Sequence, residues 1–166
     1  MQSEYNLAMK KNYIKWIRSK VGHAPIFGNH AAAVIFDNKG RILLQKRRDN
    51  KKWGLLGGHI EIGETFRETV VREVEEESGL IVGPGKLLGI YLIPPNRLFY
   101  PNGDVVVPIG VVFYCRVLKK DKSIGKSSKE TLELRYFAEN ELPEIWNPQT
   151  EKIIKDAFKK KEAVCY

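Results

Sequence analysis

The sequence predicts an α+β fold, an α/β/α sandwich in which helices cover a central mixed β-sheet. Segments with strand-like alternation are interspersed with segments of helical spacing, without a strict strand–helix–strand repeat. The composition, 43% apolar and 29% charged, is that of a globular protein. A chain of 166 residues can bury a core as one domain. We therefore expect a single domain over residues 1–166, with a helical lead-in over 1–27 and a core over 28–160.

The first part of the chain is expected to hold one helix and one hairpin. Apolar residues recur at helical spacing over residues 4–20, so a helix is predicted there. Residues 23–30 are predicted to be a loop, and residues 31–47 to form a hairpin around a DNKG turn. The glycine-rich stretch 48–58 is predicted to be a loop.

The second part is expected to contribute three strands and two helices. Apolar or alternating runs predict strands over residues 86–93, 105–118 and 131–138, and the proline inside the second of these indicates an edge or a bulge. A short helix over 139–147 and an amphipathic helix over 148–161 complete the chain.

The chain carries a formal net charge of +8, and much of the excess lies in residues 118–129 and 155–163. This charge raises the prior for polyanionic partners, but charge runs are usually solvated surface, so nucleic acid is not the favoured partner. No apolar run approaches the roughly 20 residues that span a bilayer, and the N-terminus lacks the apolar segment of a secretory signal. With only Cys115 and Cys165 as thiols, we expect a cytoplasmic protein with no membrane partner.

A further helix is predicted over residues 66–78, and it carries the densest charge of the chain. A capping box marks its start and a glycine its end, at Thr65, Glu68 and Gly79. The stretch EVEEE within it holds four glutamates in five residues. At roughly 100° per residue, Glu73, Glu76 and Glu77 share one face, whereas Glu75 points toward solvent.

Three carboxylates on one face are unfavourable unless something positive compensates them. Like charges four residues apart destabilise a helix by roughly 0.2–0.5 kcal/mol per pair, and Arg72 alone cannot neutralise three carboxylates. Divalent cations such as Mg²⁺ and Mn²⁺ prefer oxygen ligands and can do so. A solvated acidic face is the plainer alternative. The preceding stretch GGHIEIGE favours the cation, because its glycines let the backbone approach a ligand closely.

Residues 58–80 follow the pattern G-x5-E-x7-R-E-V-x-E-E-x-G-L. This pattern resembles the Nudix box at every specified position, and weaker similarity extends over about residues 28–160. One departure is Leu56, where the family commonly has proline. The resemblance implies the Nudix fold and metal-dependent hydrolysis of a phosphoanhydride bond in a nucleoside diphosphate linked to another group. It also implies Mg²⁺ or Mn²⁺ as the cofactor and a small-molecule nucleotide as the substrate.

The resemblance also assigns metal-binding roles to the residues at matching positions. Glu76 and Glu77 would be the principal metal ligands. The carbonyl of Gly58 would be a further ligand. Glu73 would act as a ligand or as the general base.

Other roles follow from the same resemblance. Arg72 would hold and orient the glutamates, and Glu64 would brace the loop before the helix. Many family members add a carboxylate from a later loop, and here Glu130 is the first candidate and Asp104 the second. The general base therefore remains open between Glu73 and Glu130.

Substrate-binding residues are less sharply indicated. Arg47, Arg48 and Arg97 can grip phosphate or a terminal group, and Trp53 can stack on a base. Surface and core positions are the plainer alternatives for these side chains, as they are for the other aromatic candidates, Tyr91, Phe99 and Tyr100. The histidines lack metal-ligand spacing and are expected to be structural: His23, His30 and His59.

The position of Pro95, 15 residues after the box, favours ADP-ribose or nucleotide-sugar substrates within the resembled family. A nucleoside-triphosphate-sanitising enzyme, an RNA 5′-end pyrophosphohydrolase and a catalytically silent nucleotide-binding module are the alternatives. The sequence leaves the oligomeric state open, with a homodimer among the options.

Overall fold

The computed structural model describes residues 13–93, 97–100, 102–120 and 130–166. Its elements, in chain order, are α2 (Tyr13–Val21), β1 (Ile26–Ile35), β2 (Ile42–Arg47), β3 (Trp53–Gly54), β4 (Leu56–His59), α3 (Phe66–Ser78), β5 (Leu80–Tyr91), β6 (Leu98–Phe99), β7 (Val105–Lys120), β8 (Thr131–Phe137), the 3-10 helix η1 (Glu139–Glu141), α4 (Pro148–Phe158) and β9 (Val164–Cys165). The start of the helix predicted over 4–20 lies outside the described residues. Within the described ranges, no helix is long and apolar enough to cross a membrane.

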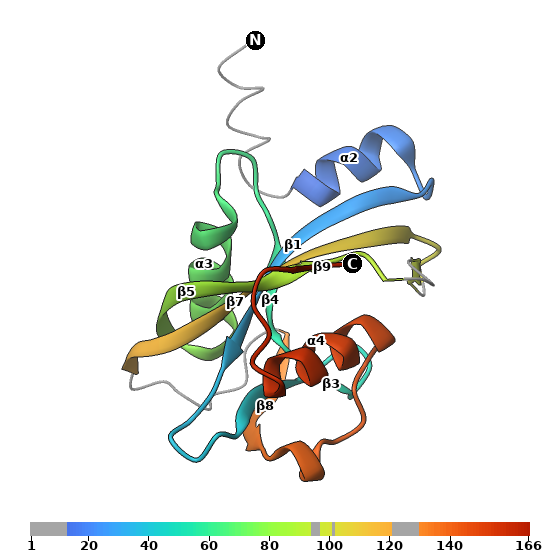
Figure 1. The fold of residues 1–166 in the computed structure, drawn as a ribbon. Helices are drawn as coiled ribbons and strands as arrows, with labels where there is room; N and C mark the ends of the chain where they lie inside the picture. The colour runs from blue at the N-terminus through green and yellow to red at the C-terminus, as the bar shows by residue number, and fades with distance from the viewer. Residues whose placement is uncertain (1–12, 94–96, 101, 121–129) are drawn as a thin grey trace.

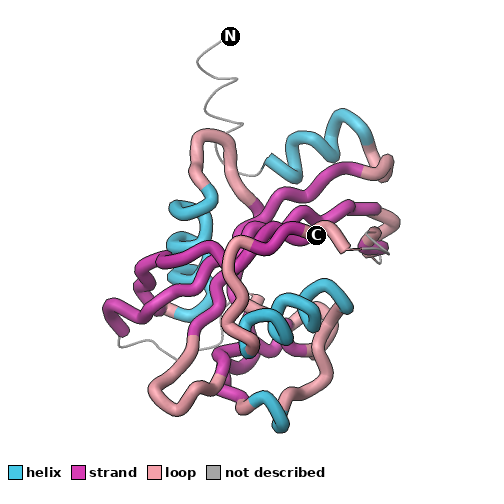
Figure 2. Tube along the Cα trace, in the orientation of Figure 1, coloured by secondary structure: helices cyan, strands magenta, loops and turns pink. Residues whose placement is uncertain are grey.

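The main sheet has the strand order β4-β1-β7-β5-β9, with β6 also paired to β7. β1 runs parallel to β7, whereas β4 and β5 run antiparallel to their neighbours β1 and β7. The predicted mixed sheet is therefore confirmed. α3 lies on one side of this sheet and α4 on the other (Figures 1 and 2).

Two clusters of buried side chains fill the space on either face of the main sheet. Alternate residues of β1 contribute to them, because successive strand side chains point to opposite faces. Ala31 and Ala33 belong to the cluster that contains Val70 and Val74 of α3. The β1 side chains that point to the opposite face pack with α4 in the second cluster: Ala32 and Val34 with Ile153, Ile154 and Ala157. The predicted α/β/α layering is confirmed by this division.

A second sheet, with the order β3-β2-β8, packs beside α4 (Figure 1). The prediction of a hairpin over residues 31–47 is wrong, because its two strands, β1 and β2, lie in different sheets. Only an isolated bridge between Phe36 and Ile42 joins them among the described residues. β1 already has β4 and β7 on its two edges, so β2 pairs instead with β3 and β8.

Several further predictions need correction, among them the short helix predicted over 139–147, of which only η1 over Glu139–Glu141 forms. Residues 26–30, predicted to be a loop, begin β1 and pair with β7. Within the loop predicted over 48–58, residues 53–54 form β3 and residues 56–58 belong to β4. The terminal helix ends at Phe158, and β9 then adds to the sheet beside β5. These segments become strands through partners distant in sequence, which a local apolar pattern does not reveal. The long strand predicted to hold a proline at an edge or bulge is β7, whose partner changes from β6 to β5 around Pro108.

Candidate active site

α3 begins and ends where the sequence predicts. The Thr65 hydroxyl accepts from the backbone N–H of Glu68, the Glu68 carboxylate accepts from the N–H of Thr65, and Gly79 ends the helix at φ 69°. Val70 and Val74 are buried against the sheet. This packing turns the glutamate face of α3 toward β4 and the loop that follows it.

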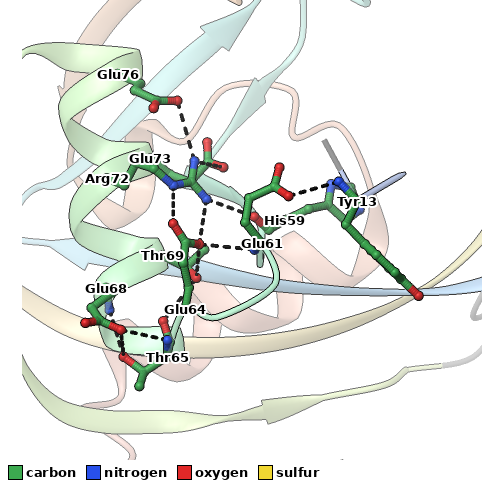
Figure 3. A network of polar contacts seen from close by, with 10 residues as sticks. All are labelled: Tyr13, His59, Glu61, Glu64, Thr65, Glu68, Thr69, Arg72, Glu73 and Glu76. Atoms are coloured by element: carbon green, nitrogen blue, oxygen red, sulfur yellow. Dashed lines mark hydrogen bonds and ion pairs between the residues drawn. The ribbon is translucent and has the colours of Figure 1, made fainter. Parts of the chain in front are cut away.

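Arg72 is the centre of the polar network on this face (Figure 3). Its Nε and Nη2 donate to the two carboxylate oxygens of Glu64, at 2.6 and 2.9 Å. Nη1 donates to Glu73 Oε1 at 2.7 Å and lies 3.5 Å from Glu76 Oε2. Nη2 also donates to the carbonyl of His59 at 3.1 Å. The guanidinium thus ties the loop to two glutamates of the helix, the arrangement that the resemblance implied for Arg72.

Glu64 supports the loop before the helix. It also accepts from the hydroxyl of Thr69 at 2.9 Å and from the backbone N–H of Glu61 at 3.1 Å. The paired Arg72 guanidinium lowers the pKa of the Glu64 carboxyl to about 2. Glu64 is therefore ionised across the neutral range and occupied on both oxygens, which fits a bracing role better than a metal-binding one.

Glu73 is partly buried beside Gly58. A methyl group added at Gly58 would come within 2.5 Å of both carboxylate oxygens of Glu73, so only glycine permits this approach. Burial raises the pKa of the Glu73 carboxyl, and the contact with Arg72 opposes that shift. The backbone of β4 and this carboxylate therefore lie together, as expected if both face one ligand.

We predict that Gly58→Ala lowers kcat/KM by about 10- to 100-fold, because the new methyl group displaces the Glu73 carboxylate. Steady-state kinetics at saturating metal checks this result. Gly85→Ala is the matched control, since a methyl group added at Gly85 would also make a tight contact, 3.2 Å from the Tyr114 carbonyl oxygen, but Gly85 lies on β5. An equal loss in both variants would contradict the prediction.

Glu77 is buried, with 5% of its surface exposed. Its Oε1 accepts from Gln45 Nε2 and its Oε2 from the backbone N–H of Gly57, both at 2.8 Å. Burial raises the pKa of the Glu77 carboxyl to about 8, although both hydrogen bonds oppose the shift. A buried negative charge is energetically costly unless a positive group lies beside it.

The remaining carboxylate candidates differ in their positions. The side chain of Glu76 is 62% exposed and points toward Arg72 (Figure 3). Glu130 is exposed, and its negative charge acts on both Glu73 and Glu77, which places it at the same site. Asp104 instead pairs with Arg18 at 3.4 Å and His23 at 2.8 Å.

Two cavities adjoin the glutamate face and share Arg47 and Glu130 in their walls. The first measures about 410 Å³ and is lined by Gln45, Arg47, Arg48, Asp49, Glu77 and Glu130. The second measures about 240 Å³ and lies between Gly58 and the start of α4. A ligand that spans both cavities would pass between guanidinium and carboxylate groups.

We call the two adjoining cavities together the cleft. The predicted substrate-binding residues divide between this cleft and the rest of the molecule. Arg47 lines both cavities; its guanidinium lies 4.5 Å from the ring of Trp146 and donates twice to Asp49. Arg48 lines the first cavity. Trp53 does not reach the cleft: it is 7% exposed and packs edge-to-face on Phe137 in the core.

Arg97 is exposed and lines neither of these two cavities. Of the other aromatic candidates, Tyr100 lines the second cavity, whereas Tyr91 is buried in the core and Phe99 is exposed. Residues missed from the sequence line the cleft as well: Gln45, His30, His59, Trp146 and Gln149. A glutamine in the apolar strand ILLQKR is the one local signal that could have drawn attention to any of them.

The donor set fits a hard divalent cation in type. Among the described residues, no three His, Cys, Asp or Glu side chains are already arranged to hold a metal ion. Arg72 donates hydrogen bonds to Glu73 and Glu64. The buried Glu77 carboxylate, by contrast, accepts hydrogen bonds from Gln45 and Gly57 and makes no ion pair within the described part of the chain. Carboxylate and carbonyl oxygens at Glu73, Glu76, Glu77 and Gly58 are the ligands that Mg²⁺ and Mn²⁺ prefer.

An acidic helix beside an arginine-lined cleft is suited to binding divalent cations and phosphate groups. Residues 27–157 match the NUDIX domain family. The chain is 40% identical over 125 residues to the ADP-ribose pyrophosphatase of Methanocaldococcus jannaschii, covering 74% of this chain and 68% of that protein. It is 29% identical over 120 residues to a MutT-like protein of Streptomyces ambofaciens, covering 72% and 70%.

The same likeness holds in three dimensions. The crystal structure of an ADP-ribose pyrophosphatase from Streptococcus suis superposes with a TM-score of 0.67 at 23% identity, covering 84% of this chain and 98% of that one. This likeness confirms the predicted fold. The chain belongs to the Nudix hydrolase family and is an enzyme of the pyrophosphatase type.

Proposed function

We propose that this enzyme hydrolyses the phosphoanhydride bond of ADP-ribose or a nucleotide sugar, with Mg²⁺ or Mn²⁺ as its cofactor. The observation that carries the proposal is the cleft itself, where Glu77 of α3 and Arg47 line the first cavity, and Arg47 and Glu130 line both. The negative oxygens of a pyrophosphate need cationic groups beside them, and the group linked to each end of the pyrophosphate needs space in the cleft. The 40% identity to a protein named ADP-ribose pyrophosphatase favours this substrate class.

The chemistry divides between the cofactor and the chain. A bound divalent ion neutralises phosphate charge and lowers the pKa of the attacking water. Gly58, Glu76 and Glu77 would hold it, and Arg72 would keep Glu73 oriented. Arg47, braced by Asp49, would bind the substrate phosphates through charge-assisted hydrogen bonds.

The general base takes the proton of the attacking water as the oxygen attacks phosphorus, and the other phosphate leaves. Glu73 and Glu130 are the two candidates. Burial already raises the pKa of Glu73, which makes it a better proton acceptor, but Arg72 occupies one of its oxygens. Glu130 lines both cavities and is the less buried of the two.

A nucleoside-triphosphate-sanitising activity is the second candidate. The likeness to a MutT-like protein favours it, and so does the second cavity, whose aromatic and amide side chains suit a nucleobase: Tyr100, Trp146 and Gln149. The retained glutamates count against a silent binding module. Pro95 and most of the lysine-rich segment 118–129, which bear on ADP-ribose and on RNA ends, lie outside the described residues.

We further propose one Nudix domain, with its core over residues 28–160, in a cytoplasmic protein. The family match over residues 27–157 supports the domain assignment. Free thiols at the buried Cys115 and the exposed Cys165 are consistent with a reducing compartment.

The test is cleavage of ADP-ribose, nucleotide sugars, dinucleoside polyphosphates, nucleoside triphosphates and capped RNA with Mg²⁺ or Mn²⁺, with products identified by mass. We expect ADP-ribose or a nucleotide sugar to be cleaved fastest. Turnover should disappear with chelator and fall by orders of magnitude in Glu76→Gln. Preference for a triphosphate would move the assignment to the second candidate, and binding without cleavage would overturn both.

A further inference from the structure

We propose that Gln45 and Thr131 are positioning residues that hold the Glu77 carboxylate for a divalent cation, an inference that rests on the metal-dependent function proposed above. Glu77 belongs to α3, whereas Gln45 lies on β2 and Thr131 begins β8. The small second sheet would therefore take part in building the metal site from outside the 58–80 motif.

Gln45 is 1% exposed, and both ends of its amide group are engaged. Its Nε2 donates to Glu77 Oε1 at 2.8 Å and to the carbonyl of Leu55 at 3.1 Å. Because a carbonyl oxygen only accepts hydrogen bonds, the contact with Leu55 requires the NH₂ group on this side of the amide. The amide therefore has a single favourable orientation toward Glu77.

Thr131 supports that orientation from the other side. Its side chain is 2% exposed, and its hydroxyl donates to Gln45 Oε1 at 2.6 Å. A reversed amide would turn its oxygen toward the Glu77 carboxylate and the Leu55 carbonyl, so that acceptors would face acceptors. In a buried network such a mismatch is costly, and the chain from Thr131 through Gln45 to Glu77 is directional.

The result is a carboxylate held at two points. Gln45 occupies one position on Oε1, and the backbone N–H of Gly57 occupies one on Oε2. A carboxylate has about four lone-pair positions, so each oxygen keeps capacity for a cation while the group is prevented from rotating. Gln45 and Glu77 both line the first cavity, which places this oriented carboxylate at the wall of the cleft. Outer partners of this kind orient metal ligands and strengthen metal binding.

The test measures Mn²⁺ binding to the metal-free full-length chain without substrate, from the electron paramagnetic resonance signal of free Mn²⁺. Gln45→Leu should raise Kd by about 10- to 100-fold. Thr131→Val should raise Kd by about 2- to 10-fold, whereas Thr131→Ser, which keeps the hydroxyl, should bind as the wild type does. Ile42→Val is the matched control: it trims a buried residue of the same strand and should lower Tm without changing Kd.

Each outcome bears on a defined claim. Wild-type Kd in Gln45→Leu, or equal losses in Thr131→Ser and Thr131→Val, would overturn the inference; the threonine pair decides it if Gln45→Leu does not fold. If the wild type binds no Mn²⁺, or if Glu76→Gln binds it unchanged, the proposed metal-dependent function fails as well. A substrate other than ADP-ribose in the cleavage panel would leave the Mn²⁺ result standing.

Discussion

Glu77→Gln is expected to lower kcat/KM by about 1000-fold or more while the chain stays folded. The substitution keeps the shape of the side chain but removes the charge that would bind the cation, and a bound metal contributes several kcal/mol of transition-state stabilisation. Glutamine resembles the protonated form of Glu77, which burial already favours by raising the pKa to about 8. Kinetics on the best substrate and a circular dichroism melt together check this result.

The control for Glu77→Gln lies on the same helix. Glu75 is exposed on the opposite side of α3, so Glu75→Gln removes one negative charge without touching the cleft. Its kcat/KM should match that of the wild type. If Glu77→Gln retained more than about a tenth of the activity, Glu77 would not be a metal ligand.

Arg72→Lys is expected to lower kcat/KM by about 10- to 100-fold and the free energy of unfolding by about 1–3 kcal/mol. Lysine keeps the positive charge but cannot donate to Glu64, Glu73 and the His59 carbonyl at once, as the guanidinium does. The loop and Glu73 would then lose their common anchor. Urea unfolding and steady-state kinetics measure the two effects.

The stability loss in Arg72→Lys should depend on pH. Pairing with Arg72 lowers the pKa of Glu64 from its ordinary 4.5 to about 2 in the folded chain. A carboxyl with a lowered folded pKa stabilises the fold above pH 4.5, and this stabilisation disappears as pH falls through about 2. The difference between wild type and variant should therefore be largest above pH 4.5 and shrink toward pH 2.

Arg67→Lys provides the comparison for this pH dependence. Arg67 also lies on α3, but its two hydrogen bonds go to the backbone carbonyls of Pro84 and Gly85. Carbonyls do not titrate in this range, so the stability loss in Arg67→Lys should be the same at pH 3 and at pH 6. A Glu64 contribution would be refuted if Arg72→Lys behaved in the same way.

The bounds of α3 were predictable because they depend on neighbours in sequence. The capping box at Thr65 and Glu68 and the stop at Gly79 need only a few consecutive residues, and the structure confirms them. The strands at 26–30 and 56–59 were missed, because they form through partners far along the chain. The hairpin over 31–47 was wrong for a related reason, since β1 already has a neighbour on each edge.

The candidate site divides in the same way. Glu73, Glu76 and Glu77 were placed on one face by helical spacing alone, and the motif added Gly58, Glu64 and Arg72. Trp53 was a candidate for the cleft because aromatic residues suit both stacking and packing, yet it lies in the core. Sequence spacing alone does not indicate whether such a residue will face the cleft or be buried in the core.

By itself, the sequence determined that this chain is a Nudix protein and which helix carries its acidic groups, because a helix face and its caps follow from consecutive residues. Only the tertiary structure decided which other side chains meet that helix. Gln45 and Arg47 of β2, Glu130 just before β8 and Trp146 shortly before α4 gather at the cleft. Their meeting depends on strand pairing and on burial, and both arise only once segments distant in sequence pack together.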